Sequence, residues 1–154
     1  MDANSNSKPL VLVLEDEALI GLNLRDDLQD AGYRVEGPFT TCAAALSWLE
    51  TATPDTAILD AALKDGPCRA IAQELTRREV LFLIYSGYHE DRKLLAEFPH
   101  VTWIEKPAPC VVSEAVMSWR HPNWECSTAI AGRLHGRLHL CAEWRSYLHR
   151  GERR

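Results

Sequence analysis

Five short apolar runs recur at nearly regular intervals along the chain, with polar or amphipathic segments between them. The runs lie at residues 10–14, 33–35, 57–59, 80–85 and 101–104. The first, third and fourth are apolar throughout and do not alternate, which is typical of strands buried on both faces. The pattern therefore predicts a sheet whose middle strands are covered on both sides.

The segments between the runs have the spacing of amphipathic helices. The first places four apolar side chains on one face: Ile20, Leu24, Leu28 and Ala31. Gly32 follows them as a stop signal, and further helices are expected near 41–51, 68–78, 90–97 and 111–119. Strands alternating with such helices indicate βαβ units. The predicted fold is α/β, a doubly wound five-stranded parallel sheet in three α/β/α layers (flavodoxin-like), with a C-terminal helical tail.

Composition and charge restrict the class of protein. With 154 residues, 46% hydrophobic and 25% charged, the chain has the size and balance of one globular domain. Residues 1–120 hold 11 Lys/Arg against 19 Asp/Glu, and residues 121–154 hold 6 against 3. An acidic body argues against direct nucleic-acid binding, because a phosphate backbone demands a concentrated basic face.

The cysteines and the termini suggest a location and a division of the chain. Five cysteines without CxxC spacing fit a reduced, cytoplasmic protein, and no apolar run is long enough to span a membrane. The polar start indicates a disordered leader at 1–8. A folded domain is expected at 9–120 and a partly helical C-terminal extension at 121–154.

Polar residues follow the predicted strands at the edge where ligands bind in such sheets. Glu15 and Asp16 follow the first run, Asp60 the third, Ser86 the fourth and Lys106 the fifth. Converging carboxylates are unfavourable unless a cation joins them, and Mg²⁺ prefers oxygen ligands. Lys106 adds a compact positive charge suited to a phosphate, and Ser86 adds a hydroxyl donor. Together these groups describe a phosphoryl-transfer site.

Four motifs, LVLVLEDE, AILDAAL, LIYSGY and WIEKP, occur in this order and resemble the receiver domains of two-component response regulators. The resemblance covers residues 9–119, and the SGY motif is similar to a subgroup with many single-domain members. It implies that Asp60 accepts a phosphoryl group from the phospho-histidine of a sensor histidine kinase or a histidine phosphotransfer protein. It also implies that Mg²⁺ is held by Asp16, by Glu15 through water, by Asp60 and by the backbone carbonyl of Ala62.

The resemblance further implies a conformational switch. Ser86 is the switch hydroxyl, Lys106 pairs with the phosphoryl group, and the surface of the fourth helix, fifth strand and fifth helix changes shape in response. Trp103 stands at the position of the switch aromatic; the alternative is that it packs on the fourth helix without moving. Neither Ala62 nor Tyr88 can orient an attacking water, so slow loss of the phosphoryl group is expected.

The expected role is a signalling switch that catalyses only its own phosphorylation and dephosphorylation. The alternative left open is a receiver-like interaction module that does not depend on phosphorylation. A haloacid-dehalogenase-like phosphatase would need a second aspartate where Ala62 stands. A flavodoxin-like cofactor module would need a phosphate-binding loop in place of the acidic EDEAL segment.

The C-terminal extension offers weaker signals. His135, His139 and Cys141 lack the further ligands that a zinc site requires. The segment is too short for a separate DNA-binding domain. We expect it to pack on the body, fray or pair with another copy, and we favour a homodimer contact, here or through the fourth helix, fifth strand and fifth helix.

Overall fold

The computed structural model describes residues 8–87, 92–99, 101–106, 112–113 and 115–117. The chain divides into two compact units, Met1–Ser113 and Glu114–Arg154. In the second unit the described residues are 115–117, which are helical and buried. The predicted extension at 121–154, with its dimer contact, lies outside the described residues.

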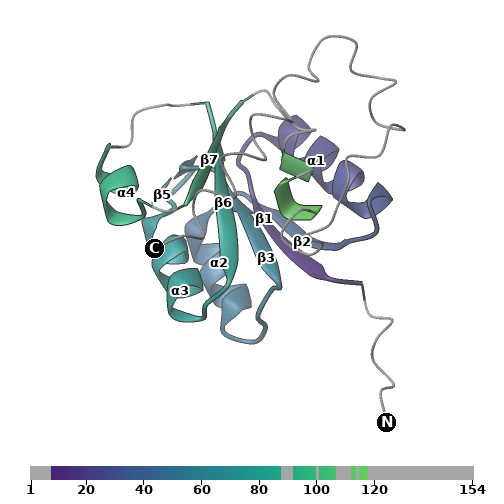
Figure 1. Cartoon of the computed structure of the whole chain (residues 1–154), viewed down its shortest axis with the longest axis horizontal. Helices are drawn as coiled ribbons and strands as arrows, with labels where there is room; N and C mark the ends of the chain where they lie inside the picture. The colour runs from purple at the N-terminus through teal and green to yellow at the C-terminus, as the bar shows by residue number, and fades with distance from the viewer. Residues whose placement is uncertain (1–7, 88–91, 100, 107–111, 114, 118–154) are drawn as a thin grey trace, which may run out of the picture. The chain divides into compact units, whose positions relative to one another are not determined.

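A five-stranded parallel sheet forms the centre of the first unit (Figure 1). Its strands, in spatial order, are β2 (Arg34–Phe39), β1 (Leu10–Leu14), β3 (Thr56–Leu59), β6 (Leu81–Ser86) and β7 (Thr102–Glu105). The three inner strands are almost completely buried, whereas β2 and β7 at the edges are largely half-exposed. All five apolar runs are therefore strands, as predicted. The strand order reverses direction between β1 and β3, which makes their carboxyl ends the switch point of the sheet.

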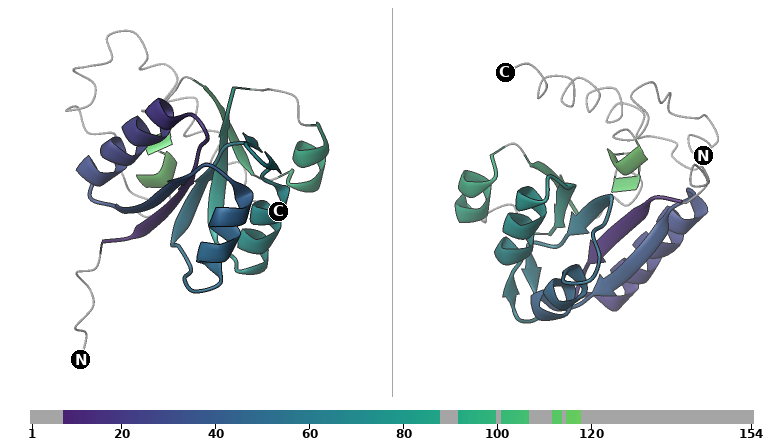
Figure 2. Two further views of the ribbon diagram at one scale, coloured as in Figure 1. Left: turned by 180° about the vertical axis from the view of Figure 1, so that it is seen from behind. Right: turned by 90° about the horizontal axis from the view of Figure 1, so that it is seen from below.

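Helices cover both faces of the sheet (Figures 1 and 2). One face carries α1 (Ala18–Asp30), and the other carries α2 (Cys42–Leu49), α3 (Arg69–Arg77) and α4 (Arg92–Glu97). Helix α1 ends where predicted, just before Gly32 with its φ of +94°, although Ala31 is an exposed capping residue and not part of the buried face. Residues 112–113 are helical, as expected for a fifth helix. None of the described helices is long and apolar enough to cross a bilayer.

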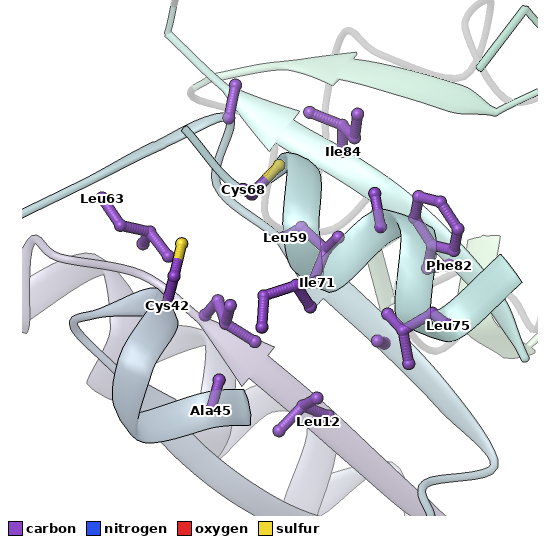
Figure 3. Packing of buried hydrophobic residues seen from close by; sticks show 14 of the residues in the cluster. Leu12, Cys42, Ala45, Leu59, Leu63, Cys68, Ile71, Leu75, Phe82 and Ile84 are labelled. Atoms are coloured by element: carbon purple, nitrogen blue, oxygen red, sulfur yellow. The ribbon is translucent and has the colours of Figure 1, made fainter. Parts of the chain in front are cut away.

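The main hydrophobic core lies between the sheet and the helices α2 and α3 (Figure 3). Leu12, Leu59 and Ile84 from three neighbouring strands face Ile71 and Leu75 of α3 across this layer. Each such side chain contributes roughly 1.5–3 kcal/mol when it is fully buried. Because successive strand residues point to opposite faces, this packing favours one register among β1, β3 and β6.

A short antiparallel hairpin, which the apolar pattern does not predict, follows β3. Its strands are β4 (Ala62–Leu63) and β5 (Gly66–Pro67), and Gly66 has a φ of +129° that favours glycine. The hairpin fills the connection from β3 to α3. It therefore begins two residues after Asp60.

Candidate functional site

The backbone hydrogen bonds of the sheet continue one residue beyond β1 and β3, to the acidic residues themselves. The amide of Glu15 donates to the carbonyl of Phe39, and the amide of Asp60 donates to the carbonyl of Leu14, both at 2.9 Å. On the far side, the amide of Lys106 donates to the carbonyl of Ser86 at 3.0 Å. The sheet thus fixes the backbone of these positions.

The side chains of Glu15, Asp60 and Lys106 meet at this edge. The ammonium Nζ of Lys106 lies 2.5 Å from Glu15 Oε2 and 3.0 Å from Asp60 Oδ2. The other carboxylate oxygen of Asp60 accepts a hydrogen bond from the amide of Ala62 at 3.3 Å. The three charged side chains are only 1%, 8% and 9% exposed. The site is therefore a nearly dry cluster in which one cation bridges two carboxylates.

A bulge in β2 helps to bury Glu15. The pairing of β1 with β2 shifts at Gly37 and Pro38, so that Leu12 pairs with Glu36 but Leu14 pairs with Phe39. Gly37 has a φ of +101°, and a Cβ there would lie 2.4 Å from the carbonyl oxygen of Val13. The bulge therefore packs tightly against the end of β1, and its proline ring faces α1.

Gly21 lets α1 approach the bulge closely. A Cβ at Gly21 would lie 2.8 Å from the ring of Pro38 and 3.4 Å from Cγ of Glu15. The glycine, the proline ring and the glutamate stem therefore share one small space. This close packing excludes water from one side of Glu15.

The burial changes the pKa values of the cluster. Burial raises the pKa of Glu15 from 4.5 to about 7, although hydrogen bonds from Lys106 and from the amide of Glu17 oppose the change. Burial also acts to lower the pKa of Lys106, but its hydrogen bonds to Glu15 and Asp60 outweigh this effect and leave that pKa above its ordinary value. Lys106 therefore carries a positive charge at neutral pH, and Glu15 changes its charge near pH 7.

The donor set fits a hard divalent cation. Glu15, Asp16 and Asp60 each offer a carboxylate oxygen, and these atoms lie within 4.8 Å of one another. Oxygen-only donors suit Mg²⁺ or Ca²⁺ and not a softer metal. Ala62, the fourth predicted ligand, begins β4 beside Asp60, where its backbone is fixed by the hairpin.

Of the three predicted switch residues, the structure describes Ser86 and Trp103, and Ser86 lies at the edge of the sheet that carries Asp60. Ser86 is fully buried at the end of β6, one position beyond the level of Asp60. Trp103 is half-buried on β7 against the hydrophobic core that includes Leu94 of α4. Its indole N–H is buried without an acceptor in the part of the chain that the structure describes. Tyr88 lies outside the described residues.

Three features of the site are not predicted from the sequence. The first is the packing of Gly21 and Pro38 against Glu15. The second is the ring of Tyr85, which lies 5.6 Å from the ammonium of Lys106, and the third is the capping of α2 by Asp65. The adjacent Gly37 and Pro38 are a sequence signal for a bulge in an edge strand. The other two depend on contacts between distant residues.

Several solved structures share this fold, and some of them are receiver domains. SdrG from Sphingomonas melonis Fr1 is 29% identical, with a TM-score of 0.62 over 72% of this chain and 95% of that chain. A CheY-like response regulator receiver domain from Methylobacillus flagellatus is 21% identical, with a TM-score of 0.62 over 73% and 98%. The receiver domain of a signal transduction histidine kinase from Syntrophus aciditrophicus is 19% identical, with a TM-score of 0.63 over 78% and 97%.

No protein-family model matches the sequence, and no curated protein matches it. The structural neighbours nevertheless confirm the predicted fold class: a flavodoxin-like five-stranded parallel sheet with the architecture of CheY-like receiver domains.

Proposed function

We propose that the chain is the phosphoacceptor receiver of a two-component or phosphorelay system, with Asp60 accepting the phosphoryl group. One observation carries the proposal. Lys106 bridges Glu15 and Asp60 at the switch point of the sheet, with the carboxylate of Asp16 beside them. Three acids and one lysine suit the transfer of a charged phosphoryl group, and all of these side chains except the half-buried Asp16 are almost fully buried. The receiver domains among the structural neighbours support the same role.

The contacts of Asp60 suit a nucleophile. Lys106 holds one of its carboxylate oxygens and the amide of Ala62 holds the other, so the carboxylate has a fixed orientation. An oxygen of Asp60 attacks the phosphorus of phospho-histidine as the P–N bond breaks, and the imidazole leaves. Lys106 then pairs with an oxygen of the phosphoryl group. A Mg²⁺ ion held by Glu15, Asp16, Asp60 and the carbonyl of Ala62 would offset the negative charge of the phosphoryl oxygens.

The switch follows from the same contacts. A phosphoryl group adds nearly two negative charges and three acceptor oxygens at Asp60. Ser86 and Lys106 respond from the ends of β6 and β7, and Trp103 lies three residues before the lysine. In this proposal the response reaches the surface that includes α4 and β7, where Trp103 packs against the core that contains Leu94.

The donor in this proposal is a histidine kinase or a histidine phosphotransfer protein. Helix α1 begins three residues after Glu15, and its Leu19 and Leu22 are 72% and 42% exposed. Apolar side chains exposed beside a charged site suit a protein donor better than a small molecule. The exposed Ala62 also offers no group to orient water, which agrees with a long-lived phosphoryl group.

Intact-mass measurement after incubation with acetyl phosphate and Mg²⁺ tests the proposal. We expect the protein to gain the mass of one phosphoryl group. Asp60→Asn should abolish the gain, and Asp26→Asn, which alters an exposed carboxylate of α1, should leave it intact. If the wild-type protein gains no mass yet still binds a partner histidine kinase, it is an interaction module that does not depend on phosphorylation.

A further inference from the structure

The hairpin β4–β5 is tied to α2 by Asp65. One carboxylate oxygen of Asp65 accepts from the amide of Cys42 at 2.7 Å, and the other accepts from the amide of Ala43 at 3.0 Å. These amides open α2 and have no partner within the helix. The hydrogen bonds span more than 20 residues of sequence, and they lower the pKa of Asp65. Asp65 is therefore a charged acceptor that joins two distant elements.

Asp65 does more than complete the helix start. Thr41 already acts as the local cap, since its hydroxyl accepts from the amide of Ala44 at 3.2 Å. A second tie runs beside it, because the amide of Lys64 donates to the carbonyl of Thr40 at 3.2 Å. The turn of the hairpin is thus held to the start of α2 at two successive residues.

The hairpin transmits this restraint to Asp60. Ala62 pairs with Pro67 across the hairpin, and its amide donates to Asp60 Oδ1 at 3.3 Å. The amide of Cys68 donates to the carbonyl of Ala61 at 3.1 Å, which closes the base of the hairpin. Every residue from 60 to 68 is therefore either in this hairpin or directly joined to it.

We propose that Asp65 is a positioning residue: its two hydrogen bonds to α2 fix the hairpin that holds the carboxylate of Asp60 and the backbone of Ala62. The inference rests on the proposed function of Asp60. Without Asp65 the turn loses both of its hydrogen bonds to the helix amides and keeps only the bond from Lys64 to Thr40 and the contacts of the Cys42 thiol, so the Asp60 carboxylate is held less firmly from that side. Because the residue acts through Ala62, its loss alters the geometry of the site and removes no group from it.

Asp65→Ala tests the inference, with Thr41→Ala as the matched control. Both substitutions remove capping interactions from the first turn of α2, but only the first removes hydrogen bonds between α2 and the hairpin. For Asp65→Ala we expect phosphorylation by acetyl phosphate to slow about tenfold, equivalent to about 1.4 kcal/mol. Calorimetry should show weaker Mg²⁺ binding, and in metal-free protein the amide of Ala62 should exchange its hydrogen faster. Thr41→Ala should change none of these three quantities.

Asp65→Asn separates the hydrogen bonds from the charge. Its amide oxygen can still accept from one of the two helix amides, so we expect only about a threefold loss of rate. The same variant carries the test if Asp65→Ala does not fold. A loss in Asp65→Asn as large as in Asp65→Ala would assign the effect to charge and overturn the inference.

Equal behaviour of Asp65→Ala and Thr41→Ala would also overturn it, because Asp65 would then be a helix cap only. The two proposals fail separately. If the wild-type protein takes up neither Mg²⁺ nor phosphate, the function of Asp60 is wrong. Hydrogen exchange at Ala62 in metal-free protein still decides whether Asp65 holds the hairpin.

Discussion

The burial of Glu15 makes the stability of the metal-free protein depend on pH in an unusual direction. Its pKa is about 7 in the folded protein against an ordinary value of 4.5. Between these values the folded state keeps a proton that the unfolded chain has lost. The free energy of unfolding therefore falls as the pH rises from about 4.5, and the fall levels off above about 7.

The size of the effect follows from the two pKa values. Each unit of difference is worth about 1.4 kcal/mol when the titration is complete. Between pH 5 and pH 8 the contribution of Glu15 amounts to a loss of about 2 to 3 kcal/mol. Glu15→Gln removes the titrating group and keeps the shape of the side chain. The free energy of unfolding of this variant should therefore lack the fall that Glu15 causes between pH 5 and pH 8.

The measurement is urea denaturation of both proteins in a chelator at several pH values from 5 to 8. The difference between wild type and Glu15→Gln cancels the titration of the six histidines that both chains carry. We expect the free energy of unfolding of the wild type, minus that of Glu15→Gln, to fall as the pH rises from 5 to 8. A flat difference, or one that moves in favour of the wild type, would refute the argument that burial dominates at Glu15. Saturating Mg²⁺ should remove the fall, because the cation stabilises the ionised carboxylate.

Two further predictions concern the bulge and the donor surface. Gly37→Ala should lower the free energy of unfolding by about 1–3 kcal/mol, since the new Cβ meets the carbonyl of Val13 at a strained φ. Gly32→Ala is its control, because the φ is also positive there but nothing lies within 4 Å, and equal losses in urea denaturation would contradict the role of the close contact. Leu19→Ser should slow phosphoryl transfer from a histidine phosphotransfer protein and leave uptake from acetyl phosphate unchanged, as measured by intact mass; equal slowing with both donors would exclude docking at Leu19.

The sheet and the main site residues were predictable because their signals are local. A continuous apolar run ends directly at Glu15, another ends at Asp60, and parallel strands bring such ends to one edge. The second strand was predicted too short, since β2 continues through Gly37 and Pro38 to Phe39. Glycine and proline are typical of a turn in sequence, but an edge strand accommodates them in a bulge.

The environment of the site was not predictable in the same way. The solvent exposure of the Glu15 side chain depends on the contact of Gly21 with Pro38, which lie on different elements. The capping of α2 by Asp65 depends equally on tertiary structure, because the strands β3 and β4 lie between the helix and Asp65 in the sequence. Local patterns thus identified the charged groups, while distant contacts set their pKa values and orientation.

The thiol of Cys42 is a chemical probe of the contact between α2 and the hairpin β4–β5. Burial, together with the negative charge of Asp65, raises the pKa of Cys42 to about 11, and its Sγ lies 3.3 Å from the carbonyl of Pro67. Alkylating reagents react with the thiolate, so this cysteine stays unmodified at neutral pH while its surroundings are closed. Where the segment after Asp60 closes faster than the reagent reacts, the rate of alkylation therefore reports the fraction of molecules in which this segment has moved away from α2.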